Sequence, residues 1–321
     1  MKSIAVLCSG GDSPGMNACL AAICKAGEHQ GFRIIGVKNG YQGLIQGKFK
    51  SLRASKAKEF IHQGGTFLGS ARSEEFKTKK GRAQAAKKLK DKGIDKLIVI
   101  GGDGSYAGAQ LLSSEHNIKV IGIPGTIDND LFGTDSTLGY DTALNTVVEA
   151  VDKIKDTSKS HRRFFFVEVM GRDAGFIALR SGIAVGADAI LIPETPTVME
   201  DLFKTLAQLK KKKKGGIILV AEGDDAGNAF HIAKAVAKEN QDYDCKVTVL
   251  GHVQRGGRPS AFDRVLAARF AIAAIEGFSK GLDSAALGLR HKAIIHYPLD
   301  QATKQHKQLN EGLLHILDLL N

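Results

Sequence analysis

The chain of 321 residues is long enough for two domains with separate hydrophobic cores. Its composition, 43% hydrophobic and 25% charged residues, is ordinary for a globular protein, and no apolar stretch is long enough to span a bilayer. The net charge of +11 permits nucleic-acid binding, but only 6% of residues are aromatic and no common nucleic-acid-binding pattern occurs. We expect arginines that bind small anions, and neither a nucleic-acid nor a membrane partner.

The cysteines indicate the redox environment. The chain has four, Cys8, Cys19, Cys24 and Cys245, and none forms a CxxC pair. This spacing argues against a zinc knuckle or a redox motif. We expect buried free thiols in a reducing cytoplasm.

Apolar runs typical of strands alternate with amphipathic helical segments. The predicted strands are residues 4–7, 33–37, 97–100, 120–123, 164–169, 189–192, 217–221 and 247–250. The clearest predicted helices are residues 17–29, 81–92, 142–157, 263–276 and 301–321. This alternation indicates parallel sheets covered by helices. Eight strands allow one large sheet or two smaller ones, and we favour an α/β protein of two stacked three-layer domains with mainly parallel sheets.

The first predicted strand runs into Ser9-Gly10-Gly11-Asp12, which opens a helix. A helix N-terminus beside glycines binds anions through its N–H groups, although a plain tight turn explains these residues equally well. No Gly-Lys-Ser/Thr follows, so the turn is not a P-loop. The dinucleotide fingerprint also fails, because the glycines are misspaced and the second strand ends in Val37-Lys38 rather than an acid.

Two later strands also end in turns that carry carboxylates. These turns are Gly101-Gly102-Asp103-Gly104-Ser105 and Pro124-Gly125-Thr126-Ile127-Asp128-Asn129-Asp130. Glycines let a backbone approach phosphate closely, and neighbouring acids can hold Mg²⁺. In an extended segment Asp128 and Asp130 would point the same way, one toward an acceptor hydroxyl and the other toward the metal. The alternatives are a helix cap for Asp103 and a solvated turn for the other two acids. Together the turns indicate phosphoryl transfer from a nucleotide.

Polar and cationic side chains gather at the ends of later strands. Arg162-Arg163 precedes the strand at 164–169 and Gly171-Arg172 follows it, whereas Glu222 and His252-Val253-Gln254-Arg255 follow two further strands. A sugar phosphate needs this mixture, cations for the phosphate and a carboxylate for the hydroxyls. Taken singly, each arginine is more often a surface residue. At the ends of adjacent parallel strands they are better explained as a pocket.

These motifs, in this order, closely resemble the ATP-dependent 6-phosphofructokinases of the bacterial type. Further matches are Gly64-Gly65-Thr66-Phe67-Leu68-Gly69-Ser70-Ala71-Arg72, Val169-Met170-Gly171-Arg172 and Gly251-His252-Val253-Gln254-Arg255-Gly256-Gly257. The resemblance implies phosphoryl transfer from MgATP to the 1-hydroxyl of fructose 6-phosphate, giving fructose 1,6-bisphosphate and ADP in glycolysis. It also implies an ATP-binding domain of residues 1–139 and 252–305, and a fructose 6-phosphate-binding domain of residues 140–251 and 306–321.

The resemblance assigns roles to individual residues. Asp128 matches the general base, Asp103 the Mg²⁺ ligand and Asp130 its supporting carboxylate. The other catalytic positions are Thr126, Arg72 and Arg172. Nucleotide positions are Gly11, Tyr41, Arg72, Ser73, Phe76, Gly102, Asp103, Gly104, Ser105 and Gly108, of which Tyr41 and Phe76 flank the nucleoside. Sugar-phosphate positions are Thr126, Asp128, Asp130, Met170, Gly171, Arg172, Glu222, His252 and Arg255. Arg163 and Lys246 match positions that reach in from a neighbouring subunit, which implies a homotetramer.

The chain departs from the family at two places. Lys246 stands where the family usually has arginine, which keeps the charge but loses the bidentate geometry of a guanidinium. At the family's effector site Ala21 and Ala54 replace arginines and Ser55 replaces a tyrosine. Part of the original character of that site remains in Lys25, Lys155, Lys211, Lys213 and Asp188. We therefore expect only weak regulation by ADP or phosphoenolpyruvate.

Three alternatives compete with this interpretation. In pyrophosphate-dependent phosphofructokinases an aspartate and a lysine fill the positions of Gly104 and Gly125, and glycine at both positions leaves room for the α-phosphate of ATP. A dinucleotide-dependent oxidoreductase is disfavoured by the failed fingerprint. A catalytically inactive regulatory subunit is disfavoured because Asp103, Asp128, Asp130 and Arg172 are all present.

Overall fold

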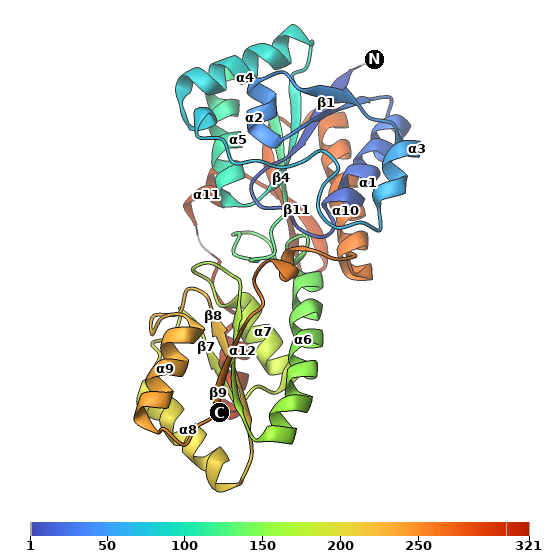
Figure 1. Ribbon diagram of the computed structural model, residues 1–321. Coiled ribbons are helices and arrows are strands. Elements are labelled where there is room, and N and C mark those ends of the chain that lie inside the picture. Colours follow the sequence, from blue (N-terminus) through green and yellow to red (C-terminus); the bar gives the residue numbers. More distant parts are fainter. Residues whose placement is uncertain (1, 306, 321) are drawn as a thin grey trace. The chain divides into compact units, whose positions relative to one another are not determined.

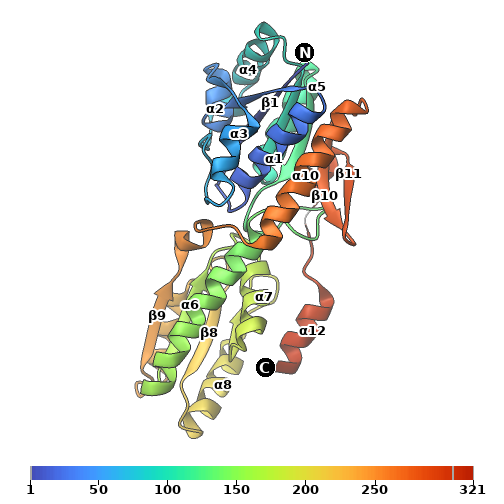
Figure 2. The same ribbon diagram turned by 90° about the vertical axis from the view of Figure 1, so that its right-hand side faces the viewer.

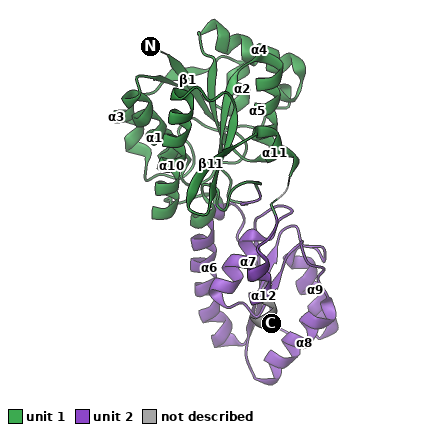
Figure 3. Cartoon of the chain, turned by 180° about the vertical axis from the view of Figure 1, so that it is seen from behind, with its two compact units in different colours: residues 1–127, 131–142, 255–307 green, residues 128–130, 143–254, 308–321 purple. Residues whose placement is uncertain are grey.

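The computed structural model describes residues 2–305 and 307–320, and the chain divides into two compact units. Unit 1 comprises residues 1–127, 131–142 and 255–307, and unit 2 comprises residues 128–130, 143–254 and 308–321 (Figure 3). The predicted domains end within a few residues of these segments, except that residues 128–130 group with unit 2. Which substrate each unit binds stays a prediction.

Unit 1 contains a seven-stranded sheet in the order β11-β10-β5-β4-β1-β2-β3. The parallel strands are β1 (Ser3–Cys8), β2 (Arg33–Val37), β4 (Lys96–Gly101), β5 (Lys119–Pro124) and β10 (Ala285–Arg290). The edge strands β3 (Phe49–Ser51) and β11 (Ala293–Tyr297) are antiparallel to their neighbours. β3, β10 and β11 were not predicted from the sequence. β3 is short and mostly exposed, and β10 is rich in Ala and Gly, which have low strand propensity.

Helices cover both faces of this sheet (Figures 1 and 2). One face packs against α1 (Met16–His29), α3 (Ala54–Ala57) and α10 (Ala261–Ser279). The other packs against α2 (Gly40–Ile45), α4 (Lys79–Asp91), α5 (Asp103–His116) and α11 (Leu299–Lys304). Along β1, Ile4 and Val6 belong to the first core while Ala5 and Leu7 belong to the second. This alternation is that of a strand buried on both faces, as expected for a parallel sheet.

Unit 2 contains a four-stranded parallel sheet in the order β7-β8-β6-β9. Its strands are β6 (Phe164–Val169), β7 (Ala189–Leu191), β8 (Gly216–Ala221) and β9 (Cys245–Val249). The helices α8 (Met199–Lys211) and α9 (Ala229–Glu239) share a core with one face of this sheet. Figure 1 shows α6 (Tyr140–His161) and α7 (Phe176–Val185) on the other face. The predicted α/β class and the division into two sheets are confirmed.

The C-terminal segment differs from the prediction of continuous helix. It contains α11 and α12 (Glu311–Leu320), and α12 packs on α7. The chain leaves the helical conformation at Gln305, whose φ of −114° and ψ of 144° are extended. Within the described residues, no helix is both long and apolar enough to cross a membrane.

The thiols largely match the expectation of buried free cysteines. Cys8, Cys19 and Cys24 are buried, whereas Cys245 is half-buried because β9 is an edge strand. Burial raises the pKa of the Cys8 thiol to about 12. Cys8 is therefore protonated and unreactive at neutral pH.

Candidate active site

The turns after β1, β4 and β5 lie together at the carboxyl end of the sheet of unit 1. The Ser9 N–H donates to the carbonyl of Ile100 at 2.9 Å, and the Gly125 N–H donates to the carbonyl of Gly101 at 3.0 Å. Ligands of open α/β sheets bind at such an edge. The first and second glycine-rich turns of the sequence analysis are therefore neighbours within one unit.

Arg255 lies against the first of these turns. Its Nη1 donates to the carbonyl of Asp12 at 3.3 Å. The guanidinium fills the space that a Cβ at Gly11 would need, so any larger residue at that position would displace Arg255. The resemblance assigns Arg255 to the sugar-phosphate pocket. That role stays a prediction, because the described contacts of Arg255 lie within unit 1.

Asp103 is the first residue of α5 and is exposed. Its Oδ1 accepts a hydrogen bond from the N–H of Gly104 at 2.7 Å. A single exposed carboxylate on a glycine-rich turn at a helix N-terminus suits Mg²⁺, which takes its remaining ligands from substrate phosphates and water. Among the described residues, no group of three His, Cys, Asp or Glu side chains could hold a metal ion alone. The geometry thus fits a metal that arrives with a phosphorylated ligand.

The glycines of the second turn differ in their surroundings. A Cβ at Gly104 would have no atom within 4 Å, so its side-chain position is open. A Cβ at Gly101 would collide with the side chain of Ser105, which is buried. A Cβ at Gly102 would lie 3.7 Å from the side chain of Thr126, the nearest group. Thr126 is therefore close to this turn, and its carbonyl accepts from the Thr137 hydroxyl at 2.6 Å.

Tyr41 and Phe76 form a face-to-face aromatic pair. Their ring centroids are 3.8 Å apart and the rings are tilted by 10°. The pair lies against Gly108, where a Cβ would come within 3.0 Å of Phe76 and 3.1 Å of Tyr41. Two rings in direct contact leave no room for a base between them, since each stacked layer needs about 3.5 Å. In this conformation they form a wall beside α5 rather than two sides of a slot.

Ser73 and Arg72 precede this wall. The Ser73 hydroxyl donates to Gln42 Oε1 at 2.6 Å and accepts from the Phe76 N–H at 3.2 Å. Ser73 thus fixes the turn that carries Phe76. Arg72 is exposed, at the end of the 64–72 motif, which is joined to the first turn where Ser70 donates to the Gly10 carbonyl at 2.5 Å.

The turn after β5 contradicts one expectation. Asp128 and Asp130 were expected to point the same way if their segment were extended, but Asn129 has a φ of 56°, in the left-handed region. Asparagine tolerates that conformation because its short polar side chain bonds locally. Asp128 and Asp130 therefore do not follow the alternation of side chains along a strand. Asp128 is 2% exposed, whereas Asp130 is half-buried.

Unit 2 brings Asp128, Arg172 and Glu222 together. Arg172 Nε lies 3.5 Å from Asp128 Oδ2. Glu222 Oε1 accepts hydrogen bonds from the N–H groups of Arg172 at 2.7 Å and of Gly171 at 3.3 Å. Arg172 has a φ of 55°, and this carboxylate bond holds its turn. Within unit 2, residues 128–130 and the turns after β6 and β8 thus meet at one cluster of opposite charges.

Gln254 was not predicted as a site residue, although it occupies the centre of the same edge of unit 2. It is fully buried, its Oε1 accepts from the Met170 N–H at 3.3 Å, and its Nε2 donates to the Gly251 carbonyl at 3.0 Å. It therefore ties the turn after β6 to η3 (Gly251–Arg255), on which His252 is exposed. A glutamine inside the 251–257 motif was the available signal.

Arg163 and Lys246 share a carboxylate that the sequence analysis also missed. Arg163 Nε is 2.6 Å from Asp244 Oδ2, and Lys246 Nζ is 2.7 Å from Asp244 Oδ1. The Lys246 and Arg163 hydrogen bonds lower the pKa of Asp244 below its usual value. Asp244 lies two residues before Lys246, the spacing that puts side chains on the same side of a strand. That spacing was a signal for the Asp244–Lys246 pair, but nothing in it indicates Arg163.

Comparisons with known proteins agree with the motifs. The family model described as Phosphofructokinase matches residues 3–278. The chain belongs to the phosphofructokinase family. It is 46% identical over its whole length to the ATP-dependent 6-phosphofructokinase 2 of Bacteroides thetaiotaomicron, of which it covers 99%. It is 48% identical to the ATP-dependent 6-phosphofructokinase of Listeria welshimeri, with full coverage of both chains.

Solved phosphofructokinase structures share the fold. The phosphofructokinase of Saccharomyces cerevisiae is 39% identical with a TM-score of 0.88, and the match covers 95% of this chain and 45% of that longer chain. The pyrophosphate-dependent phosphofructokinase of Marinobacter aquaeolei has a TM-score of 0.87 at 21% identity, covering 100% of this chain and 91% of that one. At that identity the likeness shows the fold alone.

Proposed function

We propose that this protein transfers the γ-phosphoryl group of MgATP to the 1-hydroxyl of fructose 6-phosphate, giving fructose 1,6-bisphosphate and ADP. Its full-length relatives at 46–48% identity are named ATP-dependent 6-phosphofructokinases. The structural observation that carries the proposal is the buried Asp128 carboxylate beside Arg172, with 3.5 Å between Oδ2 and Nε. A carboxylate shielded from water and oriented by a cation suits a base that accepts a hydroxyl proton.

Phosphoryl transfer requires positioning and charge neutralisation more than covalent chemistry from the protein. In the proposed mechanism Asp128 accepts the proton of the 1-hydroxyl as that oxygen attacks the γ-phosphorus. The Arg172 guanidinium orients this carboxylate and offsets negative charge on the transferring group. Arg72, which is exposed on unit 1, supplies a second cation for the phosphates.

The donor is assigned to unit 1. The N–H groups of the turns after β1 and β4 bind the phosphates, as at other glycine-rich helix N-termini. Asp103 would hold Mg²⁺, and the ion, when bound, would neutralise charge on the β- and γ-phosphates. Gly104 leaves the space beside its turn open for the α-phosphate.

The acceptor is assigned to unit 2. Glu222 Oε1 is engaged by two backbone N–H groups. Its Oε2 accepts no hydrogen bond from the described protein groups, so it is the oxygen we assign to a sugar hydroxyl. The backbone at Met170 and Gly171 and the side chains of His252 and Asp130 complete this pocket in the proposal.

The 6-phosphate is assigned to Arg163 and Lys246 of a neighbouring subunit, in a homotetramer. Both cations are paired with Asp244, and the exposed fractions of their side chains are 33% and 46%. A phosphate reaching them would compete with Asp244. Because the cations are already held together, little side-chain entropy is lost when the phosphate binds.

Pyrophosphate is the competing donor. A Cβ at Gly125 would approach Ile100 within 2.8 Å and Met16 within 3.2 Å, so core packing alone accounts for glycine there. The preference for ATP therefore rests on Gly104, whose side-chain position is open.

The test is product identification with the purified protein. Fructose 6-phosphate and Mg²⁺ are supplied with ATP or with pyrophosphate, and the phosphorus NMR spectrum is followed. We expect ATP to give ADP and a new 1-phosphate resonance, at a rate well above that with pyrophosphate. No 1-phosphate with ATP, or faster turnover with pyrophosphate, would refute the proposal.

A further inference from the structure

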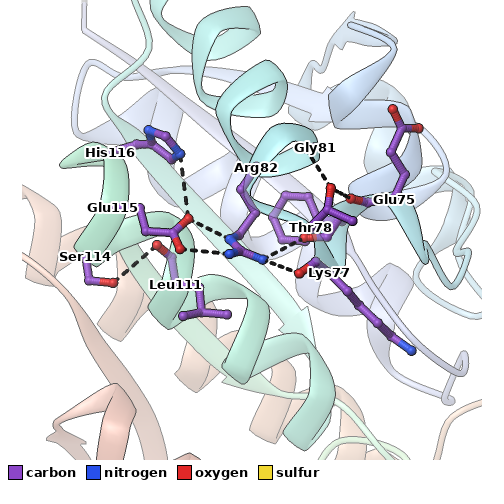
Figure 4. Close-up of polar contacts among 10 residues, drawn as sticks. Glu75, Lys77, Thr78, Gly81, Arg82, Leu111, Ser114, Glu115 and His116 are labelled. Atoms are coloured by element: carbon purple, nitrogen blue, oxygen red, sulfur yellow. Dashed lines mark hydrogen bonds and ion pairs between the residues drawn. The ribbon is translucent and has the colours of Figure 1, made fainter.

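Arg82, on the first turns of α4, is an arginine outside every predicted site and is almost completely buried. Its side chain is 5% exposed and forms a bidentate ion pair with Glu115, on the last turn of α5 (Figure 4). Nε lies 2.7 Å from Oε2, and Nη2 lies 2.8 Å from Oε1. Each group's hydrogen bond to the other raises the pKa of Arg82 and lowers that of Glu115. The pair is therefore fully ionised at neutral pH.

The third nitrogen of the guanidinium, Nη1, bonds the backbone of the segment that carries Phe76. Nη1 donates to the carbonyl of Phe76 at 3.2 Å and to the carbonyl of Lys77 at 2.6 Å. These residues form η2 (Glu75–Lys77), a single helical turn that is also held by Ser73, which accepts from the Phe76 N–H, and by Gln42, which donates to Glu75 at 3.1 Å. Thr78 adds one more restraint, since its hydroxyl donates to the Glu75 carbonyl at 2.7 Å and accepts from the Gly81 N–H at 3.0 Å (Figure 4).

The Tyr41 side chain and the Phe76 backbone are both tied to α5. At the first turn of this helix, the carbonyl of Ser105 accepts a hydrogen bond from the Tyr41 hydroxyl at 2.6 Å. Near its last turn, Glu115 fixes Arg82 and through it the backbone of Phe76. The same helix begins with Asp103 and Gly104 and carries Gly108 beneath the rings. One rigid element thus links the phosphate turn to the aromatic wall.

We propose that Arg82, oriented by Glu115, is a positioning residue that sets the place of Phe76 and with it the affinity for the nucleoside part of the phosphoryl donor. This inference rests on the proposed function, because it takes the aromatic pair as the nucleoside-facing wall. Arg82 touches the ring's backbone and not the ligand. Arg82 bonds only Glu115 and the carbonyls of Phe76 and Lys77, so we expect its replacement to lower affinity for the nucleoside more than affinity for the phosphates.

Lysine cannot replace Arg82 in this role. An ammonium group keeps the positive charge, but it cannot bond both oxygens of Glu115 and both carbonyls at fixed angles. Glutamine at position 115 keeps the size of the side chain but replaces one acceptor oxygen by a donor that faces Arg82. Both substitutions leave α4 and α5 in contact and loosen the hold on η2.

The test measures steady-state kinetics of Arg82→Lys and Glu115→Gln. We expect KM for ATP to rise about tenfold, while kcat and KM for fructose 6-phosphate stay within about twofold of the wild type. Inorganic tripolyphosphate with Mg²⁺, which lacks a nucleoside, should inhibit all three proteins with the same constant. Asp283→Asn, which removes the partner of Lys119 in an ion pair of 2.7 Å elsewhere in unit 1, is the control and should leave every constant unchanged.

Double substitution distinguishes action through Phe76 from a general loss of structure. If Arg82 acts through that ring, Arg82→Lys added to Phe76→Ala should raise KM for ATP no further than Phe76→Ala alone. Additive effects would overturn the inference. So would an unchanged or lower KM for ATP, or equal losses for ATP and tripolyphosphate. A wild type that does not use ATP would refute the proposed function itself, which keeps the two failures distinct.

Discussion

The two clusters of candidate site residues are built by different means. In unit 1 the turns consist of glycines and main-chain groups, and their shape is fixed by close packing, as where Arg255 fills the space above Gly11. In unit 2 the cluster consists of charged side chains that are paired with one another, such as Arg172 with Asp128. The first arrangement suits a ligand held by its phosphates. The second suits an anionic ligand whose binding replaces ion pairs between protein side chains by ion pairs with the ligand.

The key acids differ in the same way. Asp128 is 2% exposed and touches a cation, whereas Asp103 is exposed at the start of a helix. A general base works best where water is excluded. A magnesium ligand needs an open face, because the ion keeps several waters and phosphate oxygens. Substitutions of the glycines in unit 1 should therefore act mainly through space, and substitutions in the unit 2 cluster through charge.

The largest effect is expected at Asp128. Asp128→Asn keeps the shape of the side chain but removes the base, so kcat should fall by about 10²–10⁴ while KM for ATP changes little. Steady-state kinetics with both substrates varied measure this. A variant with nearly normal kcat would show that the buried acid of unit 2 is not the base.

Gly104 tests the claim that space governs unit 1. Gly104→Asp should raise KM for ATP by about 100-fold or more, because the carboxylate enters the open space assigned to the α-phosphate. Gly104→Ala is the matched control, since a Cβ there meets no atom within 4 Å and should leave KM for ATP close to normal. Equal tolerance of both substitutions would mean that the donor does not occupy this space.

The proposal that Arg163 of one subunit completes the acceptor site of its neighbour is tested by mixing two inactive variants. Asp128→Ser and Arg163→Ser should complement each other in hybrid oligomers, because one of the two sites at each mixed interface then carries neither defect. Equal mixing should restore about a quarter of the wild-type activity. Activity no greater than that of the separate parents would place Arg163 in its own subunit's site, or in none.

Lys246 tests whether charge geometry limits the acceptor site. Lys246→Arg restores the fork that the family usually has, and we expect KM for fructose 6-phosphate to fall about fivefold with kcat unchanged. Lys246→Met, which removes the charge, should raise the same KM. If Lys246→Arg does not lower KM for fructose 6-phosphate, the ion pair with Asp244 sets the affinity and the bidentate geometry of a guanidinium does not.

Regulation should show the smallest effect. Ala21 and Ala54 lack the cations expected for an effector phosphate, and each charge-assisted contact contributes about 1.5–3 kcal/mol. Loss of two contacts weakens binding by about two to four orders of magnitude. We expect fructose 6-phosphate saturation curves to be almost unchanged by millimolar ADP or phosphoenolpyruvate. A saturable shift at micromolar ADP would contradict this.

The glycine-rich turns at strand ends could be identified from the sequence, because such a turn is formed by residues that are adjacent in the chain. Most strands with longer apolar runs were predicted, whereas β3 is short and mostly exposed and β10 is rich in Ala and Gly. β11 was missed although its sequence, Ala-Ile-Ile-His-Tyr, is apolar. The expectation of two sheets followed from the number of strands, whereas the domain limits came from the family resemblance.

Long-range pairing was not readable. The residues around Arg82 do not indicate that it pairs with Glu115, 33 residues away. Nor does the sequence around Asp128 indicate that Asn129 adopts a left-handed conformation. The triad around Asp244 depends on the neighbouring places of β6 and β9 in the sheet. Such contacts follow from tertiary packing, in which polar side chains find partners that the periodicity of the sequence does not specify.

The most direct test of the central claim, that unit 1 binds the donor and unit 2 the acceptor, is a calorimetric titration of two variants with each ligand. Gly104→Asp should lose affinity for MgATP and keep its affinity for fructose 6-phosphate. Glu222→Gln should do the reverse, because it changes a carboxylate assigned to the sugar hydroxyls. If each variant lost both ligands, or if the losses were exchanged, the division of labour between the two units would be wrong.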